Sequence, residues 1–314
     1  MAKFLKKLQA ELALYKLVKG DPAFADFHIE EVLKGGPDQV TAVATWNGDK
    51  VVVKRSLGAQ PDREVLQAKE ELDILARIMA APPYRINECL AVFPQFGIIV
   101  LSFVPGVRLD HAIRAADLAE RATLMRLSGG WLKSYTSGRS DMSPKFSPDW
   151  WIKKQVAEGD PKAPEAVTIA SDAVLDAVKA RVPDVRGQDV TKAAVHGDFA
   201  SINAHYHVGC IYGGDVQGKA RLPVGKDVSR FLVWTQLETP LAPPLAPPEM
   251  TYVHGIAAPD MTAFLDSGVL PATEVETLLP FFIGLQLLSF VQASGPDRPN
   301  WPQVEQMVAR YTAG

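Results

Sequence analysis

The chain has 314 residues, of which 47% are hydrophobic and 22% charged, a composition typical of an ordinary soluble globular protein. Its formal net charge of -3 gives no broad electrostatic attraction for nucleic acid or for an anionic membrane, so we expect neither as a partner. The two cysteines, Cys89 and Cys210, match no zinc or redox spacing. They predict buried thiols in a cytoplasmic protein.

The first residues have the pattern of an amphipathic helix, which we predict over residues 1–18. The apolar residues expected on or near one face of this helix are Phe4, Leu5, Leu8, Leu12 and Leu14. Charged residues interrupt the apolar core that a secretory signal would need, and no small-residue cleavage site follows. The segment is therefore interpreted as part of the fold.

A three-stranded antiparallel meander is predicted next, within residues 28–55. Its strands are residues 29–33, 40–46 and 50–54. The sequence Asn-Gly between the last two strands favours the positive φ angles of a tight hairpin turn. A glycine-bearing loop, "KGGPDQ", separates the first two strands.

A long helix over residues 61–80 and a buried strand at residues 98–101 complete the small β-rich lobe, which we place at residues 1–104. The rest of the chain, residues 105–314, is predicted to be mainly helical. Its segment 278–291 is strongly apolar but shorter than the roughly 18 to 20 residues that cross a bilayer, and it predicts a core helix. The proline-rich segment 239–248 is interpreted as an exposed loop or spacer, or alternatively as a binding segment for a partner domain.

The stretch "HGDFASIN" carries the clearest chemical signal. Asp198 and Asn203 are five positions apart, and Asp215 follows twelve positions later in "YGGDVQG". Phosphoryl transfer requires an aspartate near the attacking hydroxyl and further oxygen ligands for Mg²⁺, because its catalysis is mainly positioning and neutralisation of phosphate charge. These three side chains supply that set of oxygen atoms.

Two residues of the small lobe agree with this chemistry. Lys54 ends the third predicted strand in "VVVKR", where it could bind phosphate, and Glu71 lies in the helix that follows. An ion pair between them would hold the lysine against the α- and β-phosphates of a nucleotide. Glu64 and Glu70 are competing candidates for the same role.

The chain resembles the aminoglycoside phosphotransferase and choline kinase group of small-molecule kinases over roughly residues 28–235. The motifs that carry the resemblance are "VVVK", "EELDILARI", "VLSFVPGVRL", "HGDFASIN" and "GGDVQGKARLPVGKDVSRFL". The resemblance implies an α+β, two-lobed protein-kinase-like fold: a small β-rich N-terminal lobe with one long helix, and a larger, mainly helical C-terminal lobe for catalysis and substrate binding. It also implies ATP and Mg²⁺ as cofactors.

The resemblance assigns a role to each matching position. Asp198 would act as the catalytic base, or orient the hydroxyl, while Asn203 and Asp215 would bind Mg²⁺. Lys54 would contact phosphate, with Glu71 orienting it. The segment "LSFVPG" matches the interlobe hinge, which would place the backbone of Phe103 and Val104 against the adenine edge. Asp227 would support the backbone of the catalytic loop.

Some positions depart from the family pattern. The loop "LKGGPDQV" lacks a full G-x-G-x-x-G, and Gly35 and Gly36 are the phosphate-covering candidates. No basic residue lies between Phe199 and Asn203, where protein kinases place one to contact the transferred phosphate. This absence favours a small-molecule kinase over a protein kinase.

Three other interpretations compete with the kinase. Asp198 and Asn203 could cap a polar turn. His205 and His207, on one face of a strand, could bind zinc with His196. The chain could also be a catalytically inactive kinase-like module that binds nucleotide and acts by interaction. The complete set of Lys54, Asp198, Asn203 and Asp215 argues against this last possibility.

Trp150 and Trp151 could form an aromatic wall for an acceptor, although we favour a place in the core for both. Nearby acidic residues could attract a cationic acceptor, but a solvated loop explains them more simply; they are Asp141, Asp149, Glu158 and Asp160. The sequence thus predicts an ATP- and Mg²⁺-dependent phosphotransferase. It would move the γ-phosphoryl group to a hydroxyl of an aminoglycoside-, choline- or sugar-like small molecule.

Overall fold

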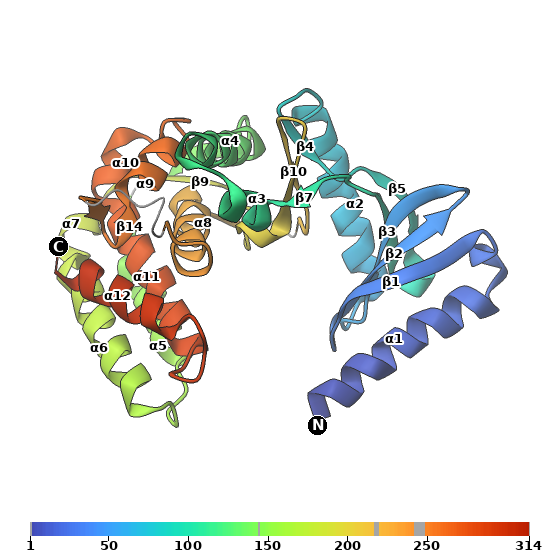
Figure 1. The fold of residues 1–314 in the computed structure, drawn as a ribbon, viewed down its shortest axis with the longest axis horizontal. Helices are drawn as coiled ribbons and strands as arrows, with labels where there is room; N and C mark the ends of the chain where they lie inside the picture. Colours follow the sequence, from blue (N-terminus) through green and yellow to red (C-terminus); the bar gives the residue numbers. More distant parts are fainter. Residues whose placement is uncertain (1, 144, 217–219, 242–248, 314) are drawn as a thin grey trace. The chain divides into compact units, whose positions relative to one another are not determined.

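The computed structural model describes residues 2–143, 145–216, 220–241 and 249–313. The chain divides into two compact units, residues 1–106 with 212–216, and residues 107–211 with 217–314. The first unit is built around a β-sheet and the second is mainly helical (Figure 1). The predicted mixture of a β-rich lobe and a larger helical lobe is confirmed.

The first unit contains two long helices, one before the first strand and one between the third and fourth strands of the chain. Its helices are α1 (Ala2–Gly20) and α2 (Pro61–Ile78). Its strands are β1 (Phe27–Gly35), β2 (Gln39–Trp46), β3 (Asp49–Ser56), β4 (Tyr84–Ile86), β5 (Cys89–Phe93) and β6 (Ile98–Ser102). Short 3₁₀ turns lie at Pro22–Phe24 and Pro94–Phe96.

Five strands form one antiparallel sheet in the order β1-β2-β3-β6-β5. The turn between β2 and β3 has φ angles of 51° at Asn47 and 88° at Gly48. These left-handed conformations are accessible to asparagine and glycine, so the Asn-Gly signal for a hairpin is confirmed. The tight turn fixes the register of β2 and β3, in which Lys54 lies opposite Thr41. On its other side β3 pairs with β6, where Lys54 lies opposite Ile99.

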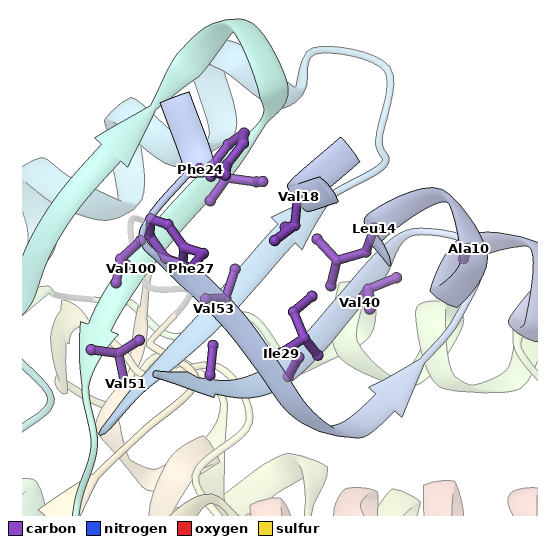
Figure 2. Close-up of a cluster of buried hydrophobic side chains, with 13 residues drawn as sticks. Ala10, Leu14, Val18, Phe24, Phe27, Ile29, Val40, Val51, Val53 and Val100 are labelled. Carbon is purple, nitrogen blue, oxygen red and sulfur yellow. The ribbon is translucent and has the colours of Figure 1, made fainter. Parts of the chain in front are cut away.

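The hydrophobic core of this unit lies between α1 and one face of the sheet (Figure 2). Ala10, Leu14 and Val18 follow each other at intervals of four residues and are buried against the strands. The predicted face of this helix was wrong in part, because Leu8 and Leu12 are 42% and 49% exposed. Phe4 and Leu5 lie outside the side chains that are described.

Strand alternation places the phosphate-binding candidate on the other face of the sheet. Val51 and Val53 belong to the core under α1, so Lys54 points to the opposite side of β3. The helix α2 contacts β3, β5 and β6, and it buries Val65, Leu72 and Leu75 as the helical spacing predicts. Lys54 and α2 therefore belong to the face of the sheet that α1 does not cover.

The second unit contains ten helices in its described part. They are α3 (Leu109–Ala115), α4 (Leu118–Thr136), α5 (Pro148–Ala157), α6 (Glu165–Ala180), α7 (Val182–Val185), α8 (Val224–Glu238), α9 (Ala258–Leu265), α10 (Ala272–Glu276), α11 (Leu278–Ala293) and α12 (Trp301–Thr312). Residues 109–136 thus form two helices with a short break between them. Asp117 is the N-cap of α4, because its side chain accepts a hydrogen bond of 2.8 Å from the backbone N–H of Glu120.

The second unit also contains short strands. They are β7 (Val107–Arg108), β8 (Ser140–Ser143), β9 (Val190–Ala194), β10 (Ala204–His207), β12 (Arg221–Pro223), β13 (Tyr252–Val253) and β14 (Ile256–Ala257), while β11 (Cys210–Gly213) lies at the division between the units. β9 is the central strand of a sheet ordered β12-β9-β8 and leads into the "HGD" motif. Residues 242–248 of the proline-rich segment lie outside the described residues.

The apolar helix α11 forms the centre of the second unit, where it contacts α6 and α8. Nearly every side chain of α11 is buried, including Phe281, Ile283 and Leu287, so its expected place in the core is confirmed. No helix in the described part of the chain is long and apolar enough to cross a membrane.

Candidate functional site

The "HGD" motif forms a loop directly after β9. Gly197 has a φ of +87°, a conformation that side chains other than glycine adopt rarely. The chain then turns through a 3₁₀ helix at Ser201–Asn203 before it enters β10. This path brings Asn203 back beside Asp198.

Asp227, in the first turn of α8, holds the loop in place. Its carboxylate accepts a hydrogen bond of 2.7 Å from the backbone N–H of His196 and one of 3.1 Å from that of Gly197. The side chain is fully buried, and this burial raises the pKa of Asp227 above its usual value. The structure thus agrees with the supporting role expected for Asp227.

The start of the loop packs against buried aromatic rings. His196 is fully buried and its ring lies within 6 Å of the rings of Trp131, Tyr135 and Phe199. Trp131 and Phe199 stack with an interplanar angle of 11°. Because this packing leaves His196 little freedom, the residue serves as an anchor for the loop rather than as a metal ligand.

Asn203 fixes the carboxylate of Asp198. The amide Nδ2 of Asn203 donates to the backbone oxygen of Asp198 at 2.8 Å and to Asp198 Oδ2 at 3.1 Å. Since the amide nitrogen faces Asp198, the amide oxygen is the atom of Asn203 that could ligate a metal ion. The two residues predicted from their spacing therefore do lie together.

Arg230, on α8, forms an ion pair with Asp198 that the sequence did not reveal. Its Nη2 and Nε lie 2.8 and 3.0 Å from Asp198 Oδ1, and the side chains of Arg230 and Asp198 are 22% and 36% exposed. The motif lacks a basic residue between Phe199 and Asn203, yet the structure brings one to the aspartate from another element. One turn earlier on the same helix, Lys226 Nζ donates to the backbone oxygen of Gly197 at 3.2 Å.

Asp198 opens into a cavity of about 230 Å³ within the second unit. Its walls come from α5, α8 and α11 together with the "HGD" loop. Trp151 lines it and meets Phe282 edge to face, with ring centroids 5.6 Å apart. A cavity with an aspartate at one side and aromatic rings at another could hold a small organic molecule.

The two tryptophans of α5 differ from the expectation that both lie in the core. Trp150 is 55% exposed and carries Lys154 Nζ at 5.4 Å from its ring, whereas Trp151 lines the cavity. Neighbouring residues of a helix point about 100° apart, so one can face a cavity while the other faces solvent. Of the nearby acidic residues only Glu158 lines the cavity, while Asp149 and Asp141 pair with arginines elsewhere in the unit.

The first unit contains an ion pair between two of the predicted residues. Lys54 Nζ lies 3.0 Å from Asp215 Oδ1, and their side chains are 15% and 22% exposed. Asp215 has a φ of 56°, a left-handed conformation that is uncommon outside glycine. The backbone turn therefore directs the Asp215 carboxylate to the strand lysine.

The other predicted nucleotide-binding residues lie in the same unit. Glu71 is only 6% exposed, whereas its competitor Glu64 is exposed and bonds Ser56, so burial favours Glu71. Gly35 ends β1, and Gly36 closes a tight turn by donating to the backbone oxygen of Gln39 at 2.9 Å. Phe103 and Val104 directly follow β6. The pairing of Lys54 with Glu71 stays a prediction.

The oxygen atoms of the two predicted metal ligands, one in each unit, suit magnesium better than zinc. Among the residues that the structure describes, no three His, Cys, Asp or Glu side chains gather as a metal site. Mg²⁺ is usually held by one or two protein oxygens together with substrate phosphates, so it needs no such cluster. The carboxylate of Asp215 and the amide oxygen of Asn203 are ligands of that kind.

The histidines and cysteines show no sign of the zinc site. His205 is half-buried on β10, where burial and then the charge of Arg108 lower its pKa below the usual value. Cys89 and Cys210 are free and half-buried rather than fully buried as predicted. Burial raises the pKa of the Cys89 thiol, which disfavours the thiolate form that binds metals.

The structure has the protein-kinase-like fold that the sequence predicts: a five-stranded sheet with a strand lysine, followed by a helical unit with an aspartate loop. No protein-family model matches the sequence, and no curated protein matches it either. The likeness is therefore one of structure.

Solved structures of small-molecule kinases share the fold over nearly the whole chain. An aminoglycoside phosphotransferase, APH(4)-Ia, has a TM-score of 0.56 at 14% identity, covering 97% of both chains. An amicoumacin kinase has a TM-score of 0.57 at 18% identity, covering 96% of this chain and 92% of its own. A choline/ethanolamine kinase family protein from Mesorhizobium loti has a TM-score of 0.56 at 14% identity, covering 96% and 93%. The expected resemblance is confirmed at the level of the fold.

Proposed function

We propose that the protein is a phosphotransferase that moves the γ-phosphoryl group of ATP to a hydroxyl group of a small molecule. The observation that carries the proposal is the position of Asp198, whose carboxylate is oriented by Asn203 and Arg230 at the side of a cavity. The Lys54–Asp215 pair adds support, because it joins the residues proposed for phosphate and metal. The similar structures are kinases of small molecules.

The reaction requires little from Asp198 beyond position and charge. The acceptor hydroxyl attacks the γ-phosphorus, so that a new phosphorus–oxygen bond forms while the bond to the β-phosphate oxygen breaks and ADP leaves. The hydroxyl proton passes to the Asp198 carboxylate. Because Asp227 holds the backbone of the loop and Asn203 holds the carboxylate, Asp198 meets the hydroxyl in one orientation.

The nucleotide is assigned to residues of the first unit. Lys54 would bind its phosphates, Glu71 would orient the lysine, and Gly35 and Gly36 would cover the phosphates. The backbone of Phe103 and Val104 would meet the adenine edge. The amicoumacin kinase structure of the same fold contains AMP-PNP and Ca²⁺, which is consistent with a nucleotide and a divalent cation here.

Magnesium would be held by Asn203 and Asp215, and when bound it would neutralise the charge of the β- and γ-phosphates. Before the nucleotide binds, Lys54 provides the positive charge beside Asp215. The lysine would then exchange its contact with the carboxylate for one with phosphate.

Replacing Asp198 with asparagine tests the mechanism. Loss of a general base lowers rates by about 100- to 10,000-fold, so Asp198→Asn should reduce acceptor-stimulated ADP release by that factor. Asp149→Asn is the matched control, because Asp149 also pairs with an arginine of the same unit but lies outside the cavity. Unchanged turnover in Asp198→Asn would show the mechanism to be wrong. Binding of ATP without any acceptor-dependent turnover would favour an inactive nucleotide-binding module instead.

A further inference from the structure

The cavity of the second unit has an excess of positive charge. Five charged side chains line it, of which three are cations and two are carboxylates. They are Lys154, Lys226, Arg230, Glu158 and Asp198. A site for an amine-rich acceptor would require the opposite balance, because like charges repel.

Pairing among the lining residues leaves one of the cations without an ion-pair partner in the lining. Arg230 pairs with Asp198 at 2.8 Å, and Lys154 lies 3.9 Å from Glu158. Lys226 forms no ion pair within the part of the chain that the structure describes, and its Nζ instead donates to the Gly197 carbonyl at 3.2 Å. Lys226 is therefore the lining cation that no lining carboxylate pairs with. The buried Asp227 attracts it from outside the lining, but that carboxylate is already hydrogen-bonded to the backbone N–H groups of His196 and Gly197.

We propose that the acceptor is a small anionic hydroxyl compound, and that Lys226 binds its negatively charged group. This inference rests on the proposed function, since it identifies the chemical class of the molecule whose hydroxyl meets Asp198. A hydroxy acid or a sugar acid has the required combination of groups. An amine-rich acceptor such as an aminoglycoside does not.

The positions of Lys226 and Asp198 restrict where the anionic group lies in the acceptor. Lys226 Nζ contacts the carbonyl of Gly197, the residue directly before Asp198 in the chain. The anion and the reacting hydroxyl therefore bind at neighbouring positions beside the same loop. The volume of about 230 Å³ also favours a small acceptor, because pockets for drug-sized ligands measure about 300 to 1,000 Å³.

The remaining walls suit the carbon skeleton of such a molecule. Trp151, Phe282 and Leu285 line the cavity and offer apolar surface to C–H groups. Polar side chains of α11, Gln286 and Ser289, line it as well and could bind further hydroxyls. These residues thus add apolar and neutral polar contacts to the charged contact that Lys226 provides.

The transferred phosphoryl group is the rival partner for Lys226. A lysine that served only this group would affect all acceptors equally, whereas a lysine that binds the acceptor distinguishes anionic from neutral acceptors. The two roles therefore differ in their dependence on acceptor charge. Kinetics with matched acceptors separates them.

The first experiment measures ADP release with acceptors matched in skeleton and different in charge. Glycerate, gluconate and glucuronate represent carboxylates, glycerol 3-phosphate represents phosphates, glycerol and glucose are neutral, and choline and kanamycin are cationic. We expect at least tenfold higher kcat/KM for anionic members than for their neutral counterparts. Comparison of glycerate with glycerol 3-phosphate tells which anion is preferred. Turnover of neutral or cationic members alone overturns the inference while the proposed function stands.

The second experiment compares Lys226→Gln with wild type on the preferred anionic acceptor. Hydrogen bonds to charged groups contribute enough that their loss weakens binding about tenfold to a hundredfold, so KM should rise by this factor while kcat changes little. Lys226→Arg should restore most of the affinity. Lys153→Gln is the matched control, since Lys153 is exposed on α5 and lies outside the cavity lining. An equal fall in kcat for anionic and neutral acceptors would assign Lys226 to the phosphoryl group and overturn the inference.

A binding measurement without ATP separates this inference from the proposed function. Ligand-detected NMR should show glycerate or glucuronate binding to wild type and to Lys153→Gln, and markedly weaker binding to Lys226→Gln. Such binding without turnover of any acceptor would support the anion site and contradict the phosphotransferase. Equal signals from wild type and Lys226→Gln, or no signal from any anionic member, would contradict the anion site.

Discussion

Arg230 reaches Asp198 from a different element, with its Nη2 only 2.8 Å from Asp198 Oδ1. The guanidinium also lies over the ring of Trp234, at 5.1 Å, which restricts its own position. Since Asn203 donates to the other carboxylate oxygen, Asp198 is held from both sides. We infer that Arg230 positions the aspartate for the acceptor hydroxyl.

Replacing Arg230 with methionine should therefore impair turnover. The loss of a charge-assisted hydrogen bond, worth about 1.5 to 3 kcal/mol, leaves the carboxylate less restrained, and we expect kcat/KM to fall about tenfold or more. Steady-state ADP release measures the effect. Arg186→Met is the control, because Arg186 forms a similar bidentate pair with the exposed Asp149. Equal activities of the two variants would contradict a positioning role for Arg230.

The sequence predicts contacts that depend on short spacing better than those that depend on packing. Asp198 and Asn203 are five residues apart, so one turn of chain suffices to join them, and the structure does join them. Arg230 and Lys226 reach the loop only through the packing of α8, which no local pattern encodes. The sequence offered one partial signal: Lys226 and Arg230 share a helix face by their i,i+4 spacing, and both lie close in sequence to Asp227, which was assigned to the loop.

Periodicity also left the orientation of single side chains unresolved. The N-terminal helix was predicted, yet its buried face contains Ala10 and Val18 rather than Leu8 and Leu12. A helix in which apolar residues occur on several sides has more than one candidate face, and only contact with the sheet decides between them. The same holds for Trp150 and Trp151: the sequence does not tell which of the two adjacent side chains faces solvent and which faces the cavity.

Lys54→Met should weaken the stabilisation of the protein by ATP and magnesium. The nucleotide stabilises the folded state in proportion to the logarithm of its concentration over Kd, so a tenfold weaker Kd removes about 1.4 kcal/mol. We expect the rise in melting temperature at saturating nucleotide to shrink or disappear. Lys69→Met is the control, since Lys69 also pairs with an aspartate but lies exposed on α2. A full thermal shift in Lys54→Met would exclude Lys54 from the nucleotide site.

Acid should destabilise the protein partly through His205. Burial lowers the pKa of His205 in the folded state, so the unfolded state binds the proton more readily. The contribution of neutral His205 to stability is complete above the unfolded pKa of about 6.5 and is lost as the pH falls from there towards the folded pKa. The melting temperature of wild type should therefore fall more than that of His205→Asn between pH 7.5 and pH 5.5. A difference that is constant with pH would contradict this prediction.

Arg121 on α4 and Asp260 on α9 form a buried ion pair, and we expect it to contribute strongly to the stability of the protein. Arg121 Nε and Nη2 lie 2.9 and 2.7 Å from the two carboxylate oxygens of Asp260, and both side chains are only 4% exposed. Arg121→Met leaves the buried carboxylate without its partner and should lower the free energy of unfolding by about 3 to 5 kcal/mol, as measured by urea denaturation.

The double variant Arg121→Met with Asp260→Leu should recover part of this loss, because an apolar pair of similar volume needs no counterion. Arg126 and Asp266 provide the matched exposed pair, 3.8 Å apart with side chains 54% and 51% exposed. Arg126→Met should change the stability by less than about 1 kcal/mol, because water screens such a pair. Similar losses of stability in Arg121→Met and Arg126→Met would show that burial does not increase the contribution of the Arg121–Asp260 pair to the free energy of unfolding.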